Sequence, residues 1–281
     1  MMNTKFISAF LALALASMAC GFKLPNAPKP GPEVKENISV SAPEGSNVNL
    51  KLSFGAGEMT LAPGADKLVD GTATYNYSAF KPVVTTEGSD IQVGMSDVEF
   101  NSFPSFNDLK NIWDIKLGDT PMDLSIEAGA YTGTFELGGL ALNALTIKDG
   151  AAEVELAFSE PNLTEMSIFQ YGTGASNVKM SGLANANFSL MDFSSGAGDY
   201  TLDFSGDLKR DASITISSGL SNMIIVVPEG VNAIVTVDSG ASNINAGAGW
   251  EQDGNTYVQG GDGPMLTFVI NIGAGNVTLT K

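Results

Sequence analysis

A short glycine-rich phrase recurs along the chain at nearly constant spacing. Residues 55–61 read GAGEMTL and residues 273–279 read GAGNVTL. Related phrases start at residues 127, 150, 174, 196, 219 and 240, so that consecutive starts from 127 to 240 differ by 23, 24, 22, 23 and 21 residues. A degraded copy, EGSDIQV, begins at residue 87. A repeat of this length is typical of a solenoid, in which each unit stacks on the next.

Apolar residues keep fixed positions around each phrase. The positions three and five residues before the start, and four residues after it, are apolar or aromatic in every copy, with mostly polar residues between them. This alternation on both sides of a bend predicts a short strand, a corner and a second short strand with one face inward. The column three residues before the start contains Leu52, Leu124, Ile147, Tyr171, Phe193, Ile216, Val237 and Ile270.

These features predict an all-β fold, a single-stranded right-handed parallel β-helix with coils of about 22 residues. Right-handedness is expected because parallel crossovers almost always have that hand. An antiparallel β-sandwich is the alternative, although it gives no reason for one phrase to recur at this spacing. Because glycine readily adopts left-handed backbone, we assign the structural corners to Gly55, Gly150, Gly174, Gly196, Gly219, Gly240 and Gly273.

Asparagines share one place after the corner. Asn177, Asn222, Asn243 and Asn276 each stand three residues after a phrase start. Stacked amides can hydrogen-bond from one coil to the next, so the sequence predicts a partial asparagine ladder.

Several longer segments resemble known families. LSFGAGEMTLAPGADKLVDGTATYNY, WDIKL and LSIEAGAYTGTFELGGLALNALTIKDGAAEVELAF resemble the toast-rack family of secreted bacterial proteins. IVVPEGVNAIVTVDSGASNINAG and the final IGAGNVTL are similar to the C-terminal domain of LiaF-type envelope-stress proteins. Together the resemblance covers residues 46–281, with the toast-rack part at about 46–120 and the LiaF-like part at about 121–281. It implies a right-handed β-helix at the cell envelope, without enzymatic activity and with sensing or interaction roles.

The first 20 residues read as an export signal. One lysine precedes an apolar run over residues 6–19, which is too short to span a bilayer but fits the core of a secretory signal. Ala19 directly before Cys20, the one cysteine of the chain, resembles the lipobox of bacterial lipoproteins. We therefore expect lipidation at Cys20, with the chain secreted and lipid-anchored on the extracytoplasmic face of a bacterial cell envelope. An ordinary cleaved signal with an incidental cysteine is the alternative.

Prolines follow this signal at residues 25, 28, 30 and 32. Such spacing favours an extended polyproline II segment, so residues 21–45 are predicted to be a linker between the lipid and a β-helix at 46–281.

Composition excludes several classes of function. The chain has 14 Lys+Arg against 31 Asp+Glu, which gives a net charge of -17. Such a negative charge would repel the phosphates of a nucleic-acid partner. It has no histidine, so it lacks the usual general base, the commonest metal ligand and every imidazole-based triad. We expect no catalytic residue, no metal and no cofactor.

Parallel β-helices also include polysaccharide lyases and hydrolases, which use charged catalytic residues. The one arginine, Arg210, lies in the polar turn GDLKRDAS, and we expect it to be a solvated loop charge. We expect the same of the acids near this turn and of a pair of acids on one predicted strand, which are Asp203, Asp207, Asp211, Glu153 and Glu155. GGDGP at 260–264 is expected to be a loop rather than a calcium site.

Two regions interrupt the repeat and are candidate interaction surfaces. Trp250 and Tyr257 lie in the one long insertion of the later coils, and Trp113 ends an aromatic-rich stretch that is either a packing flap or a ligand-binding loop. Since the chain stops at Lys281 directly after a corner and strand, we expect partner docking or self-association through an uncovered C-terminal coil.

The sequence thus predicts a non-catalytic, lipid-anchored cell-envelope protein whose β-helix is a scaffold for protein interaction or envelope sensing. The alternatives are a polysaccharide-binding or polysaccharide-degrading β-helix, and an adhesin.

Overall fold

The computed structural model describes residues 30–43, 45, 47–95 and 109–281. The predicted signal, Cys20 and most of the predicted linker lie outside these ranges, as do Phe100, Phe103 and Phe106 of the aromatic-rich stretch that ends at Trp113. The described part is all-β, with one 15-stranded sheet and two short 3-10 turns at Ser78–Phe80 and Leu183–Ala186. None of the described residues form a helix of the length and apolarity that crossing a bilayer requires.

The strands are numbered in the order in which they occur along the chain. They are β1 (Val34–Val40), β2 (Val48–Pro63), β3 (Val69–Tyr75), β4 (Pro82–Glu87), β5 (Asp90–Met95), β6 (Asn111–Leu117), β7 (Met122–Glu136), β8 (Leu142–Ala157), β9 (Met166–Ser181), β10 (Phe188–Asp203), β11 (Ala212–Val226), β12 (Asn232–Ala246), β13 (Glu251–Asp253), β14 (Thr256–Gln259) and β15 (Met265–Thr280).

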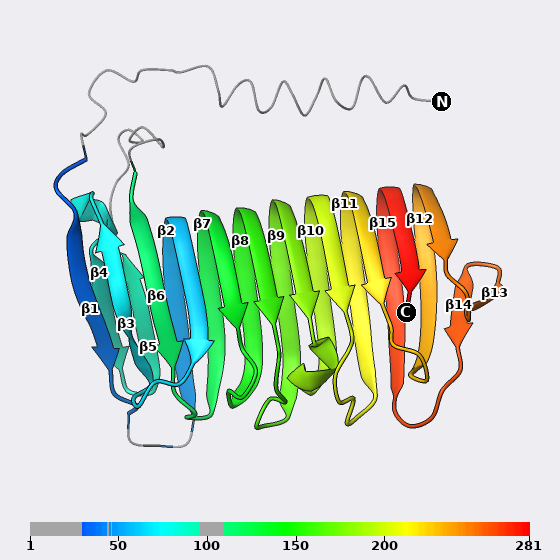
Figure 1. Ribbon diagram of the computed structural model, residues 1–281, viewed down its shortest axis with the longest axis horizontal. Coiled ribbons are helices and arrows are strands. Elements are labelled where there is room, and N and C mark those ends of the chain that lie inside the picture. Colours follow the sequence, from blue (N-terminus) through cyan, green and yellow to red (C-terminus); the bar gives the residue numbers. More distant parts are fainter. Residues whose placement is uncertain (1–29, 44, 46, 96–108) are drawn as a thin grey trace, which may run out of the picture.

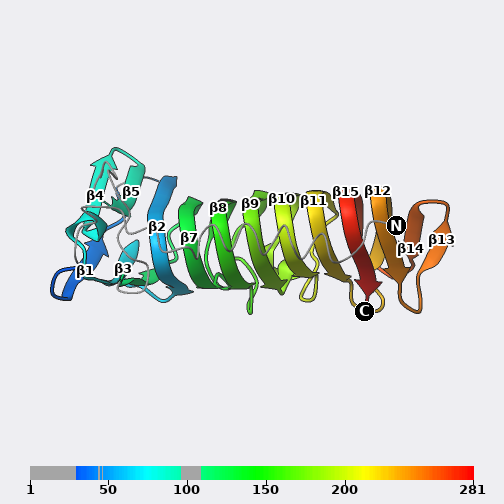
Figure 2. The same cartoon turned by 90° about the horizontal axis from the view of Figure 1, so that it is seen from above.

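Eight long strands of 15 or 16 residues form the parallel body of the sheet. Their order is β2-β7-β8-β9-β10-β11-β15-β12. Figure 1 shows them side by side, each folding over at one end, and Figure 2 shows the same row from above. The all-β class and the large, mostly parallel sheet predicted from the repeat are confirmed.

Like residues lie over like in this row, as the sequence predicts. One inward column pairs Leu52, Ile126, Ile147, Tyr171, Phe193, Ile216, Ile270 and Val237 in turn. Leu52, Ile216 and Ile270 are each 0% exposed. Burying such a side chain stabilises the fold by about 1.5–3 kcal/mol, so the columns are the core of the molecule.

One phrase start is two residues later than the sequence alignment gave. Ala128 pairs with Phe54 and Ala130 with Ala56, so Gly129 rather than Glu127 aligns with Gly55. The shift puts Gly133 in the column where the other strands have an apolar side chain. A Cβ on Gly133 would lie 2.7 Å from the Tyr131 ring, so the tyrosine fills this place in the core.

The predicted reason for the corner glycines is wrong, because none of them has a left-handed φ. They are glycines because the strands approach closely there. A Cβ on Gly174 would lie 2.5 Å from the Gly150 carbonyl oxygen, and one on Gly196 would lie 2.5 Å from that of Gly174. The same contact is 2.6 Å for Gly219, 2.7 Å for Gly273 and 2.8 Å for Gly240.

Left-handed backbone occurs two residues further on, in the three phrases that read Gly-Ala-Gly. Gly57, Gly198 and Gly275 have φ values of 133°, 152° and 131°. Other residues with negative φ occupy this place in the remaining phrases, so the corner itself does not require a left-handed residue.

The N-terminal end of the sheet is antiparallel. β5 and β6 pair in parallel with the first and second halves of β2, and β4, β3 and β1 then add in antiparallel fashion. The degraded copy at Glu87 is a hairpin turn between β4 and β5, with Gly88 at φ 64°. β1 begins at Val34 and buries Ile38 and Val40, so the predicted linker boundary at residue 45 is wrong and the sheet starts earlier.

The C-terminal coil is not at the end of the row. β15 lies between β11 and β12 and pairs in parallel with both, so the uncovered C-terminal coil expected from the sequence is wrong. The hairpin of β13 and β14 carries the chain past the outer side of β12, and the chain then returns on the inner side (Figure 1). β12 with this hairpin is therefore the last part of the sheet.

Candidate functional site

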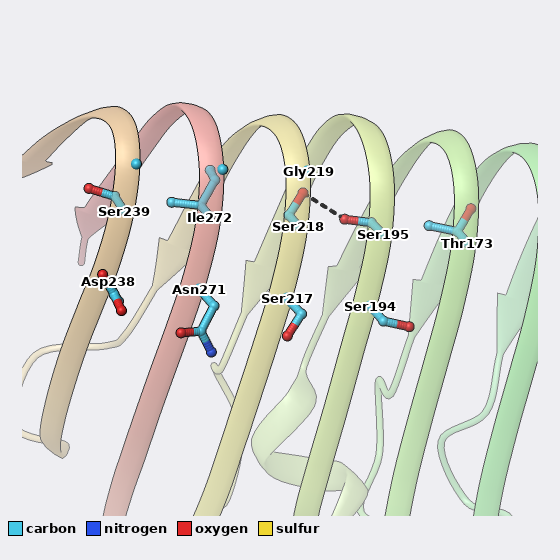
Figure 3. A pocket seen from close by; sticks show the side chains of 12 residues that line it. Thr173, Ser194, Ser195, Ser217, Ser218, Gly219, Asp238, Ser239, Asn271 and Ile272 are labelled. Atoms are coloured by element: carbon cyan, nitrogen blue, oxygen red, sulfur yellow. Dashed lines mark hydrogen bonds between the residues drawn. The ribbon is translucent and has the colours of Figure 1, made fainter.

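A polar groove of about 680 Å³ crosses five parallel strands at their bend (Figure 3). We call it the corner groove. It is lined from β9, β10, β11, β15 and β12 by Thr173, Ser194, Ser195, Ser217, Ser218, Gly219, Asp238, Ser239, Gly240, Asn271, Ile272 and Gly273.

Hydroxyl groups line this groove because of the repeat. They lie in the two positions directly before the corner glycines: both positions are serine on β10 and β11, one is a hydroxyl residue on β9 and on β12, and β15 has Asn271 and Ile272 there. Adjacent strands are about 4.8 Å apart, so the groove presents a row of hydrogen-bonding groups at that spacing. Ser195 Oγ donates to Ser218 Oγ (2.8 Å), and Ser218 Oγ donates to Ser221 Oγ (2.8 Å), which holds these hydroxyls in place.

The corner groove is lined mainly by groups that form hydrogen bonds. Its lining offers hydroxyls, one amide from Asn271 and one carboxylate from Asp238, which suit hydrogen bonds to a polyhydroxylated or amide-rich ligand. Neither histidine nor lysine is among the lining residues, and Asp238 is the one ionisable group there.

A half-buried carboxylate, Asp149, lies on β8 beside the β9 end of the corner groove, directly before the corner glycine Gly150. Asp149 Oδ2 accepts from Tyr171 Oη at 2.7 Å and from Tyr131 Oη at 3.4 Å. Asp149 Oδ1 accepts from Thr173 Oγ1 and, at 3.4 Å, from Ser176 Oγ. Four hydroxyl donors thus surround one carboxylate between neighbouring strands.

The two phenols in this cluster stay protonated. Burial raises the pKa of Tyr171 well above its usual value, and the neighbouring Tyr131 and Asp149 raise it further. Burial followed by the Asp149 charge raises the pKa of Tyr131 in the same way. This cluster was not predicted from the sequence, although Asp149 is the one acid among the described residues directly before the corner glycines, where Thr173 and Ser195 stand on the next strands.

A second polar groove, of about 550 Å³, lies on the outer face near the β4–β5 hairpin. Within its lining, Asn49 Nδ2 donates to Asp90 Oδ1 (2.6 Å), and Lys51 pairs with Glu127 (2.7 Å), which is outside the lining. The lining also includes Glu87 and Asp123. Because the corner groove repeats its polar groups over five neighbouring strands, we place the candidate ligand site there.

The aromatic residues predicted as an interaction surface are packing residues. Trp113 is 0% exposed and meets the Phe54 ring edge-on at 5.3 Å. Tyr257 is 4% exposed, and Trp250 is partly buried against the core. Trp113 on β6 and Tyr257 on β14 point inward, so the prediction that they form a surface is wrong for these two, whereas Trp250 lies just before β13.

Of the arginine and acids considered as catalytic candidates, Arg210, Asp203 and Asp211 have structural partners. Arg210 pairs with Glu165 at 2.5 Å, Asp203 accepts from Ser205 N (2.8 Å), and Asp211 accepts from Met265 N (2.8 Å). Glu153 and Glu155 lie exposed on β8. Across residues 30–43, 45, 47–95 and 109–281, no three His, Cys, Asp or Glu side chains are grouped so that they could hold a metal.

The GGDGP segment forms hydrogen bonds with the loop before β12 and with the first residue of β12. Gly261 N donates to Asn232 Oδ1 (2.8 Å), and Asn232 Nδ2 donates to the Gly263 carbonyl (2.9 Å). Asp262 N donates to the Gly230 carbonyl (3.1 Å), which agrees with the loop expected from the sequence.

The asparagine ladder is short and includes an aspartate. Asn276 Nδ2 donates to Asn222 Oδ1 (2.7 Å), and Asn222 Nδ2 donates to Asp199 Oδ1 (2.8 Å). These three residues are exposed neighbours on β15, β11 and β10, so the predicted ladder is confirmed over this part of the row.

The fold and the groove define a repetitive all-β protein with an open polar surface. A family model described as the N-terminal domain of toast_rack, DUF2154, matches residues 29–179. The match covers more than half of the chain, so the protein belongs to the toast-rack family. It also extends beyond residue 120, where the sequence analysis ended the toast-rack part. The LiaF-type resemblance of the later repeats stays a prediction.

Solved structures with similar topology come from several bacteria. A chain named a "putative cell adhesion protein" from Clostridium sporogenes has a TM-score of 0.48 and 17% identity, covering 89% of this chain and 99% of its own. A "putative adhesin" from Bacteroides fragilis has a TM-score of 0.49 and 11% identity, covering 88% and 97%. A "putative lipid binding protein" from Parabacteroides distasonis has a TM-score of 0.37 and 12% identity, covering 88% and 97%. No curated protein matches the chain.

Proposed function

We propose that the protein is a non-catalytic, lipid-anchored component of the cell envelope and that its sheet is a right-handed parallel β-helix used as a scaffold for protein interaction or envelope sensing. The observation that carries this proposal is the continuous in-register stack from β2 to β12. Such a stack is long and quasi-one-dimensional, and it repeats the same outer positions on every strand, which suits display of a surface.

The anchoring part of the proposal rests on Cys20 and can be tested directly. The full chain produced in a bacterial host with an alkyne fatty acid should incorporate the label and fractionate with membranes. Cys20→Ser should abolish the label and release the exported protein from the membrane fraction. Retention of label in this variant would overturn lipidation at Cys20.

The absence of catalysis is part of the same proposal. It is supported by the partners of Arg210, Asp203 and Asp211, which engage these charges in turns. The full chain should leave uronate polymers and neutral glycans intact with and without calcium, as monitored by absorbance of unsaturated ends and by reducing-sugar assays. Depolymerisation that persists after repurification would refute the proposal.

The corner groove favours polysaccharide binding as a second candidate function. Ser217 is an exposed serine that lines the groove, whereas Ser213 is an exposed serine on the same strand outside it. If the groove takes glycans, Ser217→Trp should block binding on a glycan panel and Ser213→Trp should not. Equal binding by both variants would place any glycan contact elsewhere. Cell or matrix binding that survives Ser217→Trp would instead favour an adhesin that acts through another surface.

A further inference from the structure

The corner groove has a direction, because its lining repeats from strand to strand. The register pairs the positions directly before the corner glycines in the order β9, β10, β11, β15 and β12, where they are Thr173, Ser195, Ser218, Ile272 and Ser239. This row therefore runs across the strands, along the long axis of the sheet (Figures 1 and 3). Neighbouring strands are about 4.8 Å apart, so the row is about 19 Å long. A ligand that fills the groove is extended and repeats at about this spacing.

This spacing distinguishes two classes of extended polymer. An extended peptide advances about 3.3 Å per residue, so its backbone groups do not keep step with strands that are about 4.8 Å apart. One pyranose ring of an extended glycan is close to the strand spacing in length, so successive sugars can meet equivalent groups on successive strands. Serine and threonine hydroxyls both donate and accept hydrogen bonds, as the hydroxyls of sugars do. The geometry of the groove therefore favours a glycan over a peptide.

The charge around the groove favours a neutral glycan. Neither lysine nor arginine is among the lining residues. A carboxylate lies at each end of the row, Asp149 on β8 beside Thr173 and Asp238 on β12. The chain as a whole has a net charge of -17. A polyanion such as a uronate polymer would be repelled on approach, so the ligand that fits is uncharged.

One strand of the five differs from the others in its chemistry. β15 has an exposed amide, Asn271, where the register places Ser217 on β11 and Asp238 on β12. The next residue, Ile272, is 3% exposed and replaces the hydroxyl that the other four strands have. β15 thus places an amide next to an aliphatic side chain (Figure 3). An acetamido group has two matching parts, an amide that can hydrogen-bond to Asn271 and a methyl group that can contact Ile272.

We propose that the corner groove binds a neutral, unbranched chain of N-acetylated amino sugars, and that Asn271 and Ile272 hold the acetamido group of one sugar. We take the glycan binding described under the proposed function as the premise, and β15 then selects the class of glycan. The sugars on either side meet Ser218 on β11 and Asp238 on β12, which lie in the neighbouring positions. Asn271 is therefore a specificity-determining residue, because a chain of glucose lacks the group that it recognises.

The experiment titrates the full chain in detergent micelles with chito-oligosaccharides and cello-oligosaccharides, from dimer to hexamer, by isothermal titration calorimetry. The two series have the same linkage and differ in the acetamido group. At each length the chito-oligosaccharide should bind about 10-fold more tightly. Affinity in this series should rise with length until the chain spans the groove, at about five sugars, and then level off. Oligogalacturonate, which is anionic, should not bind.

Asn271→Ser tests the amide directly, because it gives β15 the residue that β11 has in the same row. This variant should bind chito-oligosaccharides about 10-fold more weakly and cello-oligosaccharides as the wild type does. Asn245→Ser is the matched control, because Asn245 is an exposed asparagine on the adjacent strand β12, outside the groove. It should leave both affinities unchanged. Circular dichroism of both variants should match the wild type, since both side chains are exposed.

Equal affinity for the two series overturns the proposal, and so does tighter binding of oligogalacturonate. An affinity that does not rise with length also overturns it, because the row of strands would then contribute nothing. Asn271→Ser that weakens both series equally, or neither, shows that Asn271 does not recognise the acetamido group. Binding without preference between the series leaves glycan binding in place and removes only the class of glycan, whereas a lack of binding by any of the three probes refutes both.

Discussion

In the middle of the row and at its C-terminal end, equivalent residues stack in the same columns, but the strands are arranged in a different chain order. From β7 to β11 each strand lies beside the next one in sequence. At the C-terminal end, β15 lies between β11 and β12, yet Ile270 aligns with Ile216 on one side and with Val237 on the other. The column position, and not the order along the chain, therefore determines which residues meet.

The two ends of the sheet differ from its middle, and from each other, in how strand pairing stops. In the middle, every long strand is paired on both sides in register. The N-terminal end turns to antiparallel strands and carries charge on β1, whereas at the C-terminal end none of the described strands pairs with the outer side of β12 over residues 238–246. A repeat thus specifies how strands stack, and non-repeating segments specify where stacking stops.

The largest expected effect tests whether the middle is more completely packed than the end. Ile216 is 0% exposed in the centre of its column, whereas Ile244 at the last strand is partly buried. Ile216→Ala should lower the free energy of unfolding by about 2–5 kcal/mol because it removes fully buried methyl groups and leaves a cavity. Ile244→Ala should cost about half as much or less. Denaturant unfolding of the two variants measures the difference, and equal losses would contradict the comparison.

The next effect tests close strand approach at the corners. Gly174→Ala places a Cβ 2.5 Å from the Gly150 carbonyl oxygen, so the strands must move apart and the free energy of unfolding should fall by about 1–3 kcal/mol. Gly260→Ala is the control, because a Cβ there meets nothing within 4 Å and φ is not left-handed. It should change stability by less than about 0.5 kcal/mol. A neutral Gly174→Ala would show that the corner tolerates wider spacing.

A smaller effect tests the polar cluster in the middle of the row. Tyr171→Phe removes the hydroxyl that donates to Asp149, and should cost about 1–2 kcal/mol at neutral pH. The folded-state pKa of Tyr171 is raised, so its contribution is fully present below the unfolded pKa of about 10 and is lost as pH rises above it. Thermal unfolding from pH 7 to 11 should therefore show a smaller alkaline loss in Tyr171→Phe than in the wild type. An unchanged alkaline slope would mean that Tyr171 does not titrate on unfolding in this range.

The smallest effect concerns the ion pair between Arg210 and Glu165. The Glu165 side chain is 78% exposed, so solvent screens the pair despite its 2.5 Å separation. Glu165→Gln should change the free energy of unfolding by less than about 1 kcal/mol, measured in the same denaturant series. A loss as large as that of Ile216→Ala would indicate that this loop supports the stack far more than its exposure suggests.

The sequence predicted the repeating strands better than the segments that interrupt them. Leu52, Ile216 and Ile270 share the predicted buried column because alternation of apolar residues is a local property of each strand. Trp113 and Tyr257 were misassigned to the surface, because an interruption of the repeat does not reveal which way its aromatic side chains face. Both lie on the inward face of strands that close the sheet.

By itself, the sequence determined the repeat length, the inward columns and the all-β class, since each follows from residue type and spacing along the chain. Tertiary structure alone decided that β15 enters between β11 and β12, that Asp149 gathers hydroxyls from β7 and β9, and that the corner glycines serve close strand approach. These depend on contacts between residues about 20 to more than 50 positions apart, and the free energy of such contacts is set by neighbours in space that local patterning does not specify.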